Sequence, residues 1–491
     1  MTTKPLFLER QWHLKELNVI YGWRKGITGK NITVCVVDDG VYYNPDLEIK
    51  DTKFNPIIKN FNLLLRKESY LHGTSVAGII GAKGNEYVVG IAYDCTLIAY
   101  NLTGNPMVKH KYPLAIYILK YNNKIDIFNN SWGPIITNNP NDITPYHFDI
   151  LRAIEISSME GRKKKGNIFV FASGNDALRG GLAAYNLLIN NRFIIAVGAA
   201  NSNLDKSTYS NYGINILCIA PAGNDRTLLE IIQDIPITAS YDQFGITTTL
   251  PYTKDFYKKG FIPYTHDFDG TSAACPMVSG CIALLLSYRP DLTWRDVKEL
   301  ISRSCYQDYF VNNIVHNSDF ILNGRKQIIS QKTGYGMINL KRLIKNAKKW
   351  NLLPKEKYTR REQHFDLILN RDNKQITINF DIKDKFFIET VQVYLTVNSN
   401  PPILNQLIFN TFVTLISPQE TKLPLINISF IDPDFLIREK QYYNNEPFLC
   451  ELLRGEISSG IWTIQFDWIP IEEILDAQFC LKHIKLDIYG H

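Results

Sequence analysis

Six short apolar runs constrain the fold of this chain more than any other feature. The runs are apolar at successive positions and end near Gly, Asn, Asp or Ser; they cover residues 31–40, 95–102, 124–133, 167–175, 192–200 and 214–223. Strands that are apolar on both faces are typical of a parallel sheet covered by helices on both sides. Helical segments fit at 73–82, 146–160 and 272–286. Residues 32–290 therefore predict an α/β domain, whose ligands should bind at the carboxyl ends of the strands.

A second domain is expected because the sequence pattern changes after residue 353. Residues 360–491 read as short alternating strands separated by Pro, Asn, Asp and Gly turns, which is typical of an all-β sandwich. The length of 491 residues also exceeds the roughly 100–200 residues of one domain. We predict an α/β domain over 1–352, a linker over 353–359 and a β-sandwich over 360–491.

Charge and hydropathy exclude two classes of partner. The chain has 54 Lys and Arg against 48 Asp and Glu, a net charge of +6, and its basic residues are scattered apart from the run 163–165. This pattern gives little support to nucleic-acid binding. No apolar stretch approaches the roughly 18 residues of a membrane span, and the first 15 residues do not read as a secretory signal. We expect no nucleic-acid and no membrane partner. The protein is cytoplasmic as written, or secreted if a leader has been removed.

The cysteine pattern favours reduced thiols over a disulfide framework. Most of the eight cysteines lie in apolar runs, where free thiols behave as small core hydrophobes. The sequence contains neither a Cys-x-x-Cys pair nor a histidine cluster at metal spacing, so no zinc site is expected.

Four polar residues carry the chemistry that the sequence suggests. Asp38 and Asn175 follow predicted strands, His72 and Ser272 open predicted helices, and each has a glycine nearby. A serine hydroxyl is a weak nucleophile, so it needs an imidazole to accept its proton and a carboxylate to hold that imidazole in the right tautomer. Attack on a peptide carbonyl creates an oxyanion, which Asn175 and the backbone N–H of Ser272 would stabilise at the positive end of a helix.

Each of these residues also has an ordinary structural explanation. A strand-end Asp is more often a turn or cap residue, and Gly-Thr-Ser before an apolar run is a common helix N-cap. The four together, in the order Asp, His, Asn, Ser and each in its own glycine context, make coincidence improbable.

The motifs resemble those of the subtilisin-like serine endopeptidases, and more narrowly of their kexin and furin branch. The resemblance rests on VVDDG around Asp38, HGTSVAG around His72, SWGP at 131–134, FASGN around Asn175 and GTSAACP around Ser272. The order Asp, His, Ser and the Asn oxyanion donor are those of subtilisin itself. The last 130 residues look like the P domain of the kexin branch. The resemblance implies a subtilisin-like parallel sheet with helices on both faces, followed by an all-β, jelly-roll-like sandwich.

The resemblance also implies roles for single residues. Asp38, His72 and Ser272 would be catalytic, and Asn175 would bind the oxyanion. The substrate would contact Asp39, Ser131, Trp132, Gly133, Ile135 and Ile136. Kexin-type enzymes carry acidic residues after SWGP, where this chain has the two isoleucines. A buried guanidinium without a carboxylate is costly, so we predict an apolar or small primary pocket. Asp39 could still favour a basic residue one position further from the scissile bond.

A structural calcium ion is the one metal that the resemblance implies, and the chemistry itself needs no cofactor. The family binds calcium with oxygen ligands. Asp46 and Asn85 match two ligand positions, while the amino-terminal acidic ligand is replaced near Thr3 or Lys4. A turn-forming role after Pro45 is the alternative for Asp46.

We therefore expect a serine endopeptidase that cleaves polypeptides through an acyl-enzyme on Ser272. Its activity should fall below about pH 6–7, where an ordinary histidine gains a proton. The alternative is a catalytically silent peptide-binding protein on a protease scaffold. We also expect a monomer, a separate inhibitory propeptide as partner, and a sandwich that braces the catalytic domain.

Overall fold

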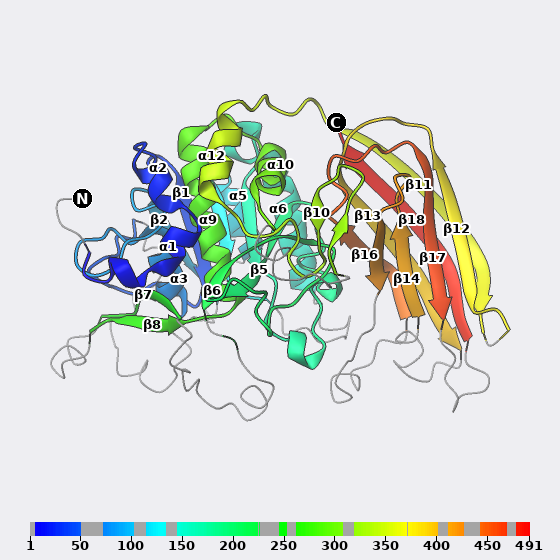
Figure 1. Cartoon of the computed structure of the whole chain (residues 1–491), viewed down its shortest axis with the longest axis horizontal. Helices are drawn as coiled ribbons and strands as arrows, with labels where there is room; N and C mark the ends of the chain where they lie inside the picture. The colour runs from blue at the N-terminus through cyan, green and yellow to red at the C-terminus, as the bar shows by residue number, and fades with distance from the viewer. Residues whose placement is uncertain are drawn as a thin grey trace.

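The chain folds into an α/β part and a β-sandwich that lie next to each other (Figure 1). This is the fold class that the sequence predicts. The computed structural model describes residues 5–50, 72–102, 114–133, 145–223, 225, 245–252, 262–307, 319–370, 372–400, 411–426, 442–468 and 478–491.

Six parallel strands form the centre of the α/β part, in the order β2-β1-β3-β4-β5-β6. Strands β3 to β6 are buried at every position, because their apolar side chains supply both faces of the sheet. All six predicted runs contain one of these strands. Their bounds are β1 (Thr33–Asp38), β2 (Thr96–Asn101), β3 (Ile127–Asn130), β4 (Ile168–Ala172), β5 (Ile194–Asn201) and β6 (Ile216–Gly223).

Helices cover both faces of this sheet. On β2, Leu97 lies against Gly81 of α3, whereas the ring of Tyr100 packs 4.7 Å from that of Tyr117 in α5. Positions 97 and 100 point to opposite faces of a strand, so α3 and α5 lie on opposite sides. The helical elements are η1 (Leu8–Arg10), α1 (Trp12–Glu16), α2 (Val19–Trp23), α3 (His72–Gly81), α5 (Leu114–Tyr121), α6 (Pro145–Lys164), η5 (Ala177–Arg179), η6 (Ala183–Tyr185), α9 (Thr271–Tyr288), α10 (Trp294–Ser304) and α12 (Leu340–Lys348).

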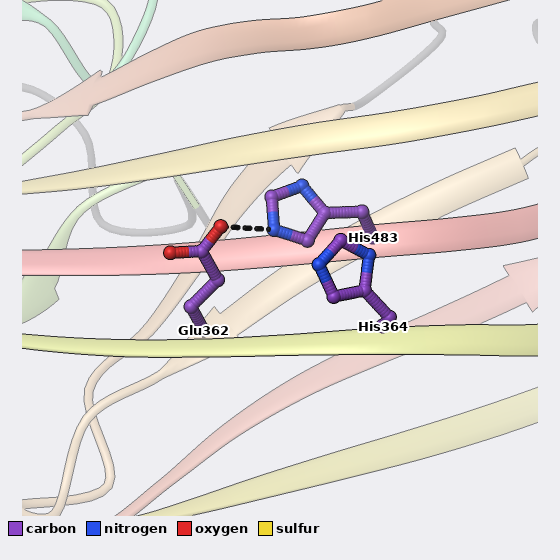
Figure 2. Close-up of side chains that lie close together, drawn as sticks. All are labelled: Glu362, His364 and His483. Atoms are coloured by element: carbon purple, nitrogen blue, oxygen red, sulfur yellow. Dashed lines mark hydrogen bonds and ion pairs between the residues drawn. The ribbon is translucent and has the colours of Figure 1, made fainter.

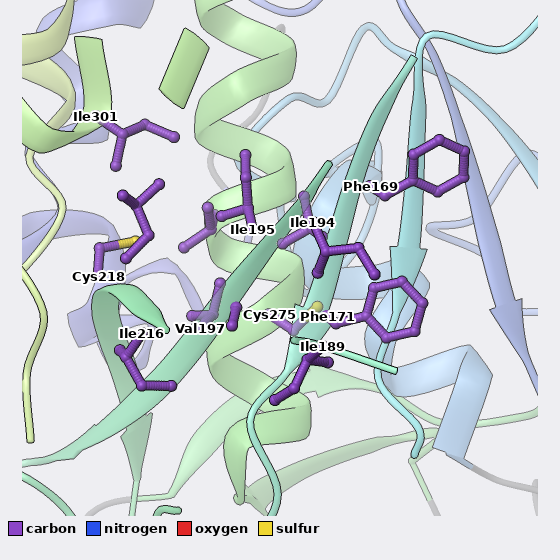
Figure 3. Packing of buried hydrophobic residues seen from close by; sticks show 14 of the residues in the cluster. Phe169, Phe171, Ile189, Ile194, Ile195, Val197, Ile216, Cys218, Cys275 and Ile301 are labelled. Atoms are coloured by element: carbon purple, nitrogen blue, oxygen red, sulfur yellow. The ribbon is translucent and has the colours of Figure 1, made fainter. Parts of the chain in front are cut away.

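Helix α9 fills the core beside the sheet. It is long and apolar enough to cross a membrane, but 83% of it is buried inside the protein. Figure 3 shows its surroundings, where Phe171 of β4, Val197 of β5 and Cys275 of α9 belong to one apolar cluster. The apolar surface of α9 therefore packs against protein.

A short antiparallel pair connects the elements that carry His72 and Ser272. It consists of β7 (Ile246–Thr249) and β8 (Tyr264–Phe268). The hydroxyl of Ser75 in α3 donates to the carbonyl of Thr249, and the hydroxyl of Thr248 donates to the carbonyl of Ser75. Since β8 ends three residues before α9 begins, this pair fixes α3 relative to the start of α9. A second short pair is β9 (Ile321–Leu322) with β10 (Ile328–Ile329).

Two four-stranded antiparallel sheets form the sandwich, in the orders β11-β18-β13-β16 and β12-β17-β14-β15. In β12 every second residue is buried, which is the alternation that the sequence predicts. Strand β11 begins at Lys357, so the last residues of the expected linker 353–359 already belong to a strand. The bounds are β11 (Lys357–Leu369), β12 (Gln375–Ile382), β13 (Ile388–Asn400), β14 (Thr411–Ile416), β15 (Lys422–Ile426), β16 (Tyr442–Cys450), β17 (Gly460–Trp468) and β18 (Gln478–Gly490).

Buried ion pairs join the two parts. Lys298 of α10 places its ammonium 2.7 Å from a carboxylate oxygen of Glu451, which follows β16. The guanidinium of Arg454 donates to the other oxygen of the same carboxylate. All three side chains are at most 2% exposed. A charge buried this deeply must be paired, and Lys298 of the α/β part has its carboxylate partner, Glu451, in the sandwich. The α/β part and the sandwich therefore depend on each other here.

Candidate active site

The carboxyl edge of the parallel sheet gathers the predicted catalytic side chains. Asp38 is the last residue of β1, Ser131 follows β3, and Asn175 lies three residues after β4. His72 is the first residue of α3, and Ser272 is the second residue of α9. Strands β1 and β3 are neighbours, with Val37 opposite Asn130. Residues more than two hundred positions apart therefore meet at this edge.

Asp38 and His72 form a direct hydrogen bond. The distance from Nδ1 of His72 to Oδ1 of Asp38 is 2.8 Å. Asp38 is buried, while the imidazole of His72 is 35% exposed and packs edge-on against Phe268 at 5.4 Å. Because a carboxylate can only accept, Nδ1 carries a proton, and Nε2 is left as the basic nitrogen of a neutral ring.

A close approach between β1 and α3 makes this hydrogen bond possible. A side chain at Gly73 would place its Cβ 2.4 Å from the carbonyl oxygen of Gly40 and 3.0 Å from Cβ of Asp38. Only glycine allows the first turn of α3 to lie this close to the end of β1. This explains the glycine that follows His72.

Asp39 holds the start of α3. Its carboxylate accepts the backbone N–H of His72 at 3.2 Å and that of Gly73 at 2.7 Å, and the residue is only 6% exposed. The first N–H groups of a helix have no partner within the helix, so this carboxylate caps it. Burial, together with the charge of Asp38, raises the pKa of Asp39 to about 7. The oxygens of Asp39 thus position His72; the substrate contact expected of Asp39 stays a prediction.

The environment of His72 stabilises its protonated form. Burial works against the charge, but the charge of Asp38 and its hydrogen bond outweigh burial and raise the pKa of His72 to about 9. Asp39 and Asp269 act in the same direction. The expectation of an ordinary pKa for His72 is therefore corrected, since its neighbours move the pKa upward.

Ser272 makes two reciprocal contacts with Ser131. The hydroxyl of Ser272 donates to the carbonyl of Ser131 at 3.2 Å, and the hydroxyl of Ser131 donates to the carbonyl of Ser272 at 3.1 Å. The second contact has a cause in the sequence. Pro276 has no N–H, so the carbonyl four residues before it, that of Ser272, has no helical partner and accepts from Ser131 instead.

The hydroxyl of Ser272 therefore points to the strand end, and no hydrogen bond joins it to His72 within the described part of the chain. Catalytic hydrogen bonds are often long or absent without substrate and form only in the complex.

Asn175 is held with its amide nitrogen available. Its Oδ1 accepts both the backbone N–H and the hydroxyl of Thr271, each at 2.9 Å. An N–H group can only donate, so these contacts fix which side of the amide carries the oxygen. Nδ2 belongs to an exposed residue and donates no hydrogen bond among the described residues. The backbone N–H of Ser272 lies in the first turn of α9, where N–H groups lack helical partners. Two donors are therefore free to bind an oxyanion.

Three supporting residues were not singled out from the sequence. Thr271 fixes Asn175, and Tyr209 accepts the backbone N–H of Gly270 at 3.1 Å. Asn129 lies buried below the site, where its Oδ1 accepts from Ser279 at 2.8 Å and its Nδ2 donates to Ser131 at 3.1 Å. Thr271 directly precedes Ser272 in the motif GTSAACP, so this motif could have pointed to it. The other two depend on tertiary contacts.

The segment that follows β3 contains three of the residues that the sequence assigns to substrate contact. Ser131 is buried, Trp132 packs against Phe171 at 5.7 Å, and Gly133 is exposed. A Cβ at Gly133 would meet only Asn186, at 3.7 Å, so there is room above this residue. Ile135 and Ile136, which the sequence assigns to the primary pocket, lie outside the described residues.

The residues around Asp46 do not fit a calcium ion. Both carboxylate oxygens of Asp46 already accept hydrogen bonds at 2.8–3.0 Å, from the N–H groups of Glu86, Tyr87 and Val88 and from the hydroxyl of Tyr264. Calcium needs oxygen atoms that face it without intervening donors. Asn85 is exposed, and its amide nitrogen donates to the carbonyl of Pro45 at 3.3 Å. Thr3 and Lys4 lie outside the described residues.

Comparisons with known proteins agree on one family. A family model described as the subtilase family matches residues 29–336. Human proprotein convertase subtilisin/kexin type 6 is 26% identical over 97% of this chain and 46% of its own length. Kexin of Saccharomyces cerevisiae is 30% identical over 70% of this chain and 40% of its own length. The chain thus spans less than half the length of these relatives.

Solved structures support the same fold. A serine protease of Aeromonas sobria is similar over 100% of this chain and 96% of its own chain, with a TM-score of 0.80 and 20% sequence identity. The same protease solved in complex with the chaperone ORF2 gives a TM-score of 0.78 over 99% of this chain and 95% of that one, also at 20% identity. At this identity the likeness shows the fold alone, and it extends over both parts of the chain.

Proposed function

Because the chain belongs to the subtilase family, we propose that it is a serine endopeptidase with Ser272 as its nucleophile. The observation that carries the proposal is the 2.8 Å hydrogen bond between Asp38 and His72, at the sheet edge that also holds Ser272 and Asn175. A carboxylate bonded to Nδ1 leaves Nε2 of the imidazole to accept the proton of a serine. Peptide-bond hydrolysis is the reaction that these four groups support best.

In the acylation step, Oγ of Ser272 attacks the carbonyl carbon of the substrate while Nε2 of His72 takes its proton. The carbonyl oxygen becomes an oxyanion, which accepts from Nδ2 of Asn175 and from the backbone N–H of Ser272. His72 then gives its proton to the leaving amine, and the C–N bond breaks. Asp38 stays ionised throughout and stabilises the imidazolium.

Deacylation follows the same steps with water as the nucleophile. His72 takes a proton from water, the hydroxide attacks the acyl-enzyme ester, and the proton returns to Oγ of Ser272 as the acid product leaves. The substrate must first draw the hydroxyl of Ser272 away from the carbonyl of Ser131, its acceptor without substrate.

Substrate specificity follows from the segment after β3. We place the substrate backbone along residues 131–133, because this segment directly follows β3, Gly133 is exposed and there is room beside it. We assign an apolar or small primary pocket, since isoleucines occupy positions 135 and 136. Profiling cleavage of a peptide library checks this assignment, and a strong demand for Arg before the scissile bond would refute it.

A separate chaperone or inhibitory propeptide is the partner that we propose. The support is the Aeromonas sobria protease, which has the same fold and was solved with a chaperone. The test is expression of the chain alone and with candidate chains encoded beside it. A gain in folded, inhibited protein supports such a partner, and efficient folding of the chain alone contradicts it.

Hydrolysis of a fluorogenic peptide library tests the activity itself. Wild type should cleave it, and Ser272→Ala should not. Ser287→Ala is the matched control, because Ser287 lies in the same helix and donates to the carbonyl of Leu284, away from the site. Folding of every variant is checked by circular dichroism. Peptide binding by folded wild type without any cleavage would instead support the catalytically silent binder.

A further inference from the structure

Two histidines and a glutamate meet on one face of the sandwich. His364 of β11 lies directly opposite His483 of β18, and Glu362 lies two residues before His364 on the same face. Figure 2 shows the three side chains gathered between the two strands. His483 lies more than a hundred positions after Glu362 and His364 in the sequence, so spacing along the chain does not relate the three residues.

The geometry of this group is close to that of a metal site. The imidazole rings of His364 and His483 stack with centroids 4.5 Å apart and planes 22° apart. Oε1 of Glu362 lies 2.8 Å from Nε2 of His483. One ligand atom from each residue lies within 4.8 Å of the other two. Ligands around a tetrahedral zinc ion, with bonds of about 2.0–2.2 Å, lie about 3.4 Å apart, so small side-chain rotations complete the site.

The type of ligand selects the type of metal. Imidazole nitrogens bind zinc, copper, nickel and iron, whereas calcium and magnesium prefer oxygen. Two histidines and one glutamate are the protein ligands of several zinc enzymes, which leave the fourth position to water. Glu362 and His364 are exposed, while the side chain of His483, on β18 between β11 and β13, is only 12% exposed.

The position in the sandwich gives such a metal a structural effect. Among the described residues, strand β11 is the edge strand of its sheet and pairs there with β18 alone. An ion held by Glu362, His364 and His483 would connect these two strands through their side chains.

His483 and Tyr489 are six residues apart and lie on the same face of β18. Arg192 of the α/β part stacks on Tyr489 at 3.7 Å, so this is the sheet face that meets the α/β part at its far end.

We propose that Glu362, His364 and His483 bind a divalent transition metal of the zinc class, which pins the edge strand of the sandwich. This site is separate from the catalytic edge and from the calcium positions that the family resemblance implies.

The test is titration of the metal-free full chain with zinc chloride, in competition with a chromophoric chelator. One equivalent should bind and raise the unfolding temperature. His364→Asn and His483→Asn should each weaken binding by at least about tenfold, since even groups that only orient a ligand contribute roughly 10–100-fold. His147→Asn, which removes a histidine from α6, should bind as wild type does. Cobalt bound to wild type should show the intense visible absorption of a tetrahedral site.

Glu362→Gln provides the check that does not depend on folding. Its side chain is 44% exposed, so the substitution should not unfold the sandwich, and it keeps both imidazoles. Zinc affinity should fall while circular dichroism stays unchanged. The absence of stoichiometric zinc binding by wild type would overturn the proposal. So would equal affinity in the wild type and in all three cluster variants.

Discussion

Replacing Lys298 by methionine should destabilise the whole chain, because this ammonium holds the two parts together from inside. Its Nζ lies 2.7 Å from Glu451, 2.7 Å from the carbonyl of Arg192 and 3.0 Å from that of Ile194. Burial lowers the pKa of Lys298 to about 8, so the group is still charged at pH 7. Methionine matches its length but offers no donor.

The size of the effect follows from what remains behind. Removing one partner of a buried ion pair costs about 3–5 kcal/mol, because the other charge stays buried. Glu451 keeps Arg454, which favours the lower end of this range, but two buried carbonyls lose a donor at about 1–3 kcal/mol each. Taken at the lower ends of both ranges, these costs add to an expected loss of about 5 kcal/mol in the free energy of unfolding.

Urea unfolding at pH 7, followed by tryptophan fluorescence, measures this loss. Lys332→Met is the matched control, since Lys332 pairs with Asp319 at the surface and is 41% exposed. Surface pairs contribute about 0–1 kcal/mol, so this variant should unfold near the wild-type midpoint. Equal midpoints for Lys298→Met and Lys332→Met would refute the account of the junction.

Four further predictions concern the catalytic edge and Asp46. Asn175→Ala should lower kcat by about 10²–10³ with little change in KM, as loss of the corresponding donor does in subtilisin; an unchanged kcat excludes it from the oxyanion site. Asp38→Asn should lower kcat by about 10⁴ at neutral pH, which steady-state kinetics can measure, and a loss below tenfold would argue against the triad. Protonation removes the base, and the raised pKa of His72 moves this protonation to a higher pH than for an ordinary histidine. The value of kcat/KM should therefore fall with decreasing pH through a midpoint above 6.5; a profile flat from pH 8 to pH 5 contradicts this. Asp46→Ala should lower the unfolding temperature, and calcium should raise that of neither wild type nor variant; a calcium-dependent rise in wild type would show that an ion displaces the hydrogen bonds.

Much of the α/β part could be predicted because local sequence determines it. Each parallel strand is a continuous apolar run, and α9 follows from the apolar residues after Ser272. The order of Asp38, His72 and Ser272 along the chain, each with a glycine nearby, predicts that they share one site. The alternation in β12 likewise predicted a half-buried strand.

What escaped the sequence depends on contacts between distant segments. The capping role of Asp39 arises because α3 lies against the end of β1 and presents two N–H groups to its carboxylate. The oxygens of Asp46 are occupied because the segment after α3 folds back over them. The pairing of Lys298 with Glu451 joins residues that no local pattern relates.

Labelling with a phosphonofluoridate, followed by mass spectrometry of the peptides, tests the central claim most directly. The reagent reacts only with a serine whose proton is removed by a neighbouring base. The account predicts one adduct on Ser272 in folded wild type, a strong loss of labelling in His72→Ala, and none in Ser272→Ala. An adduct on another residue, or folded wild type that does not react, would contradict it.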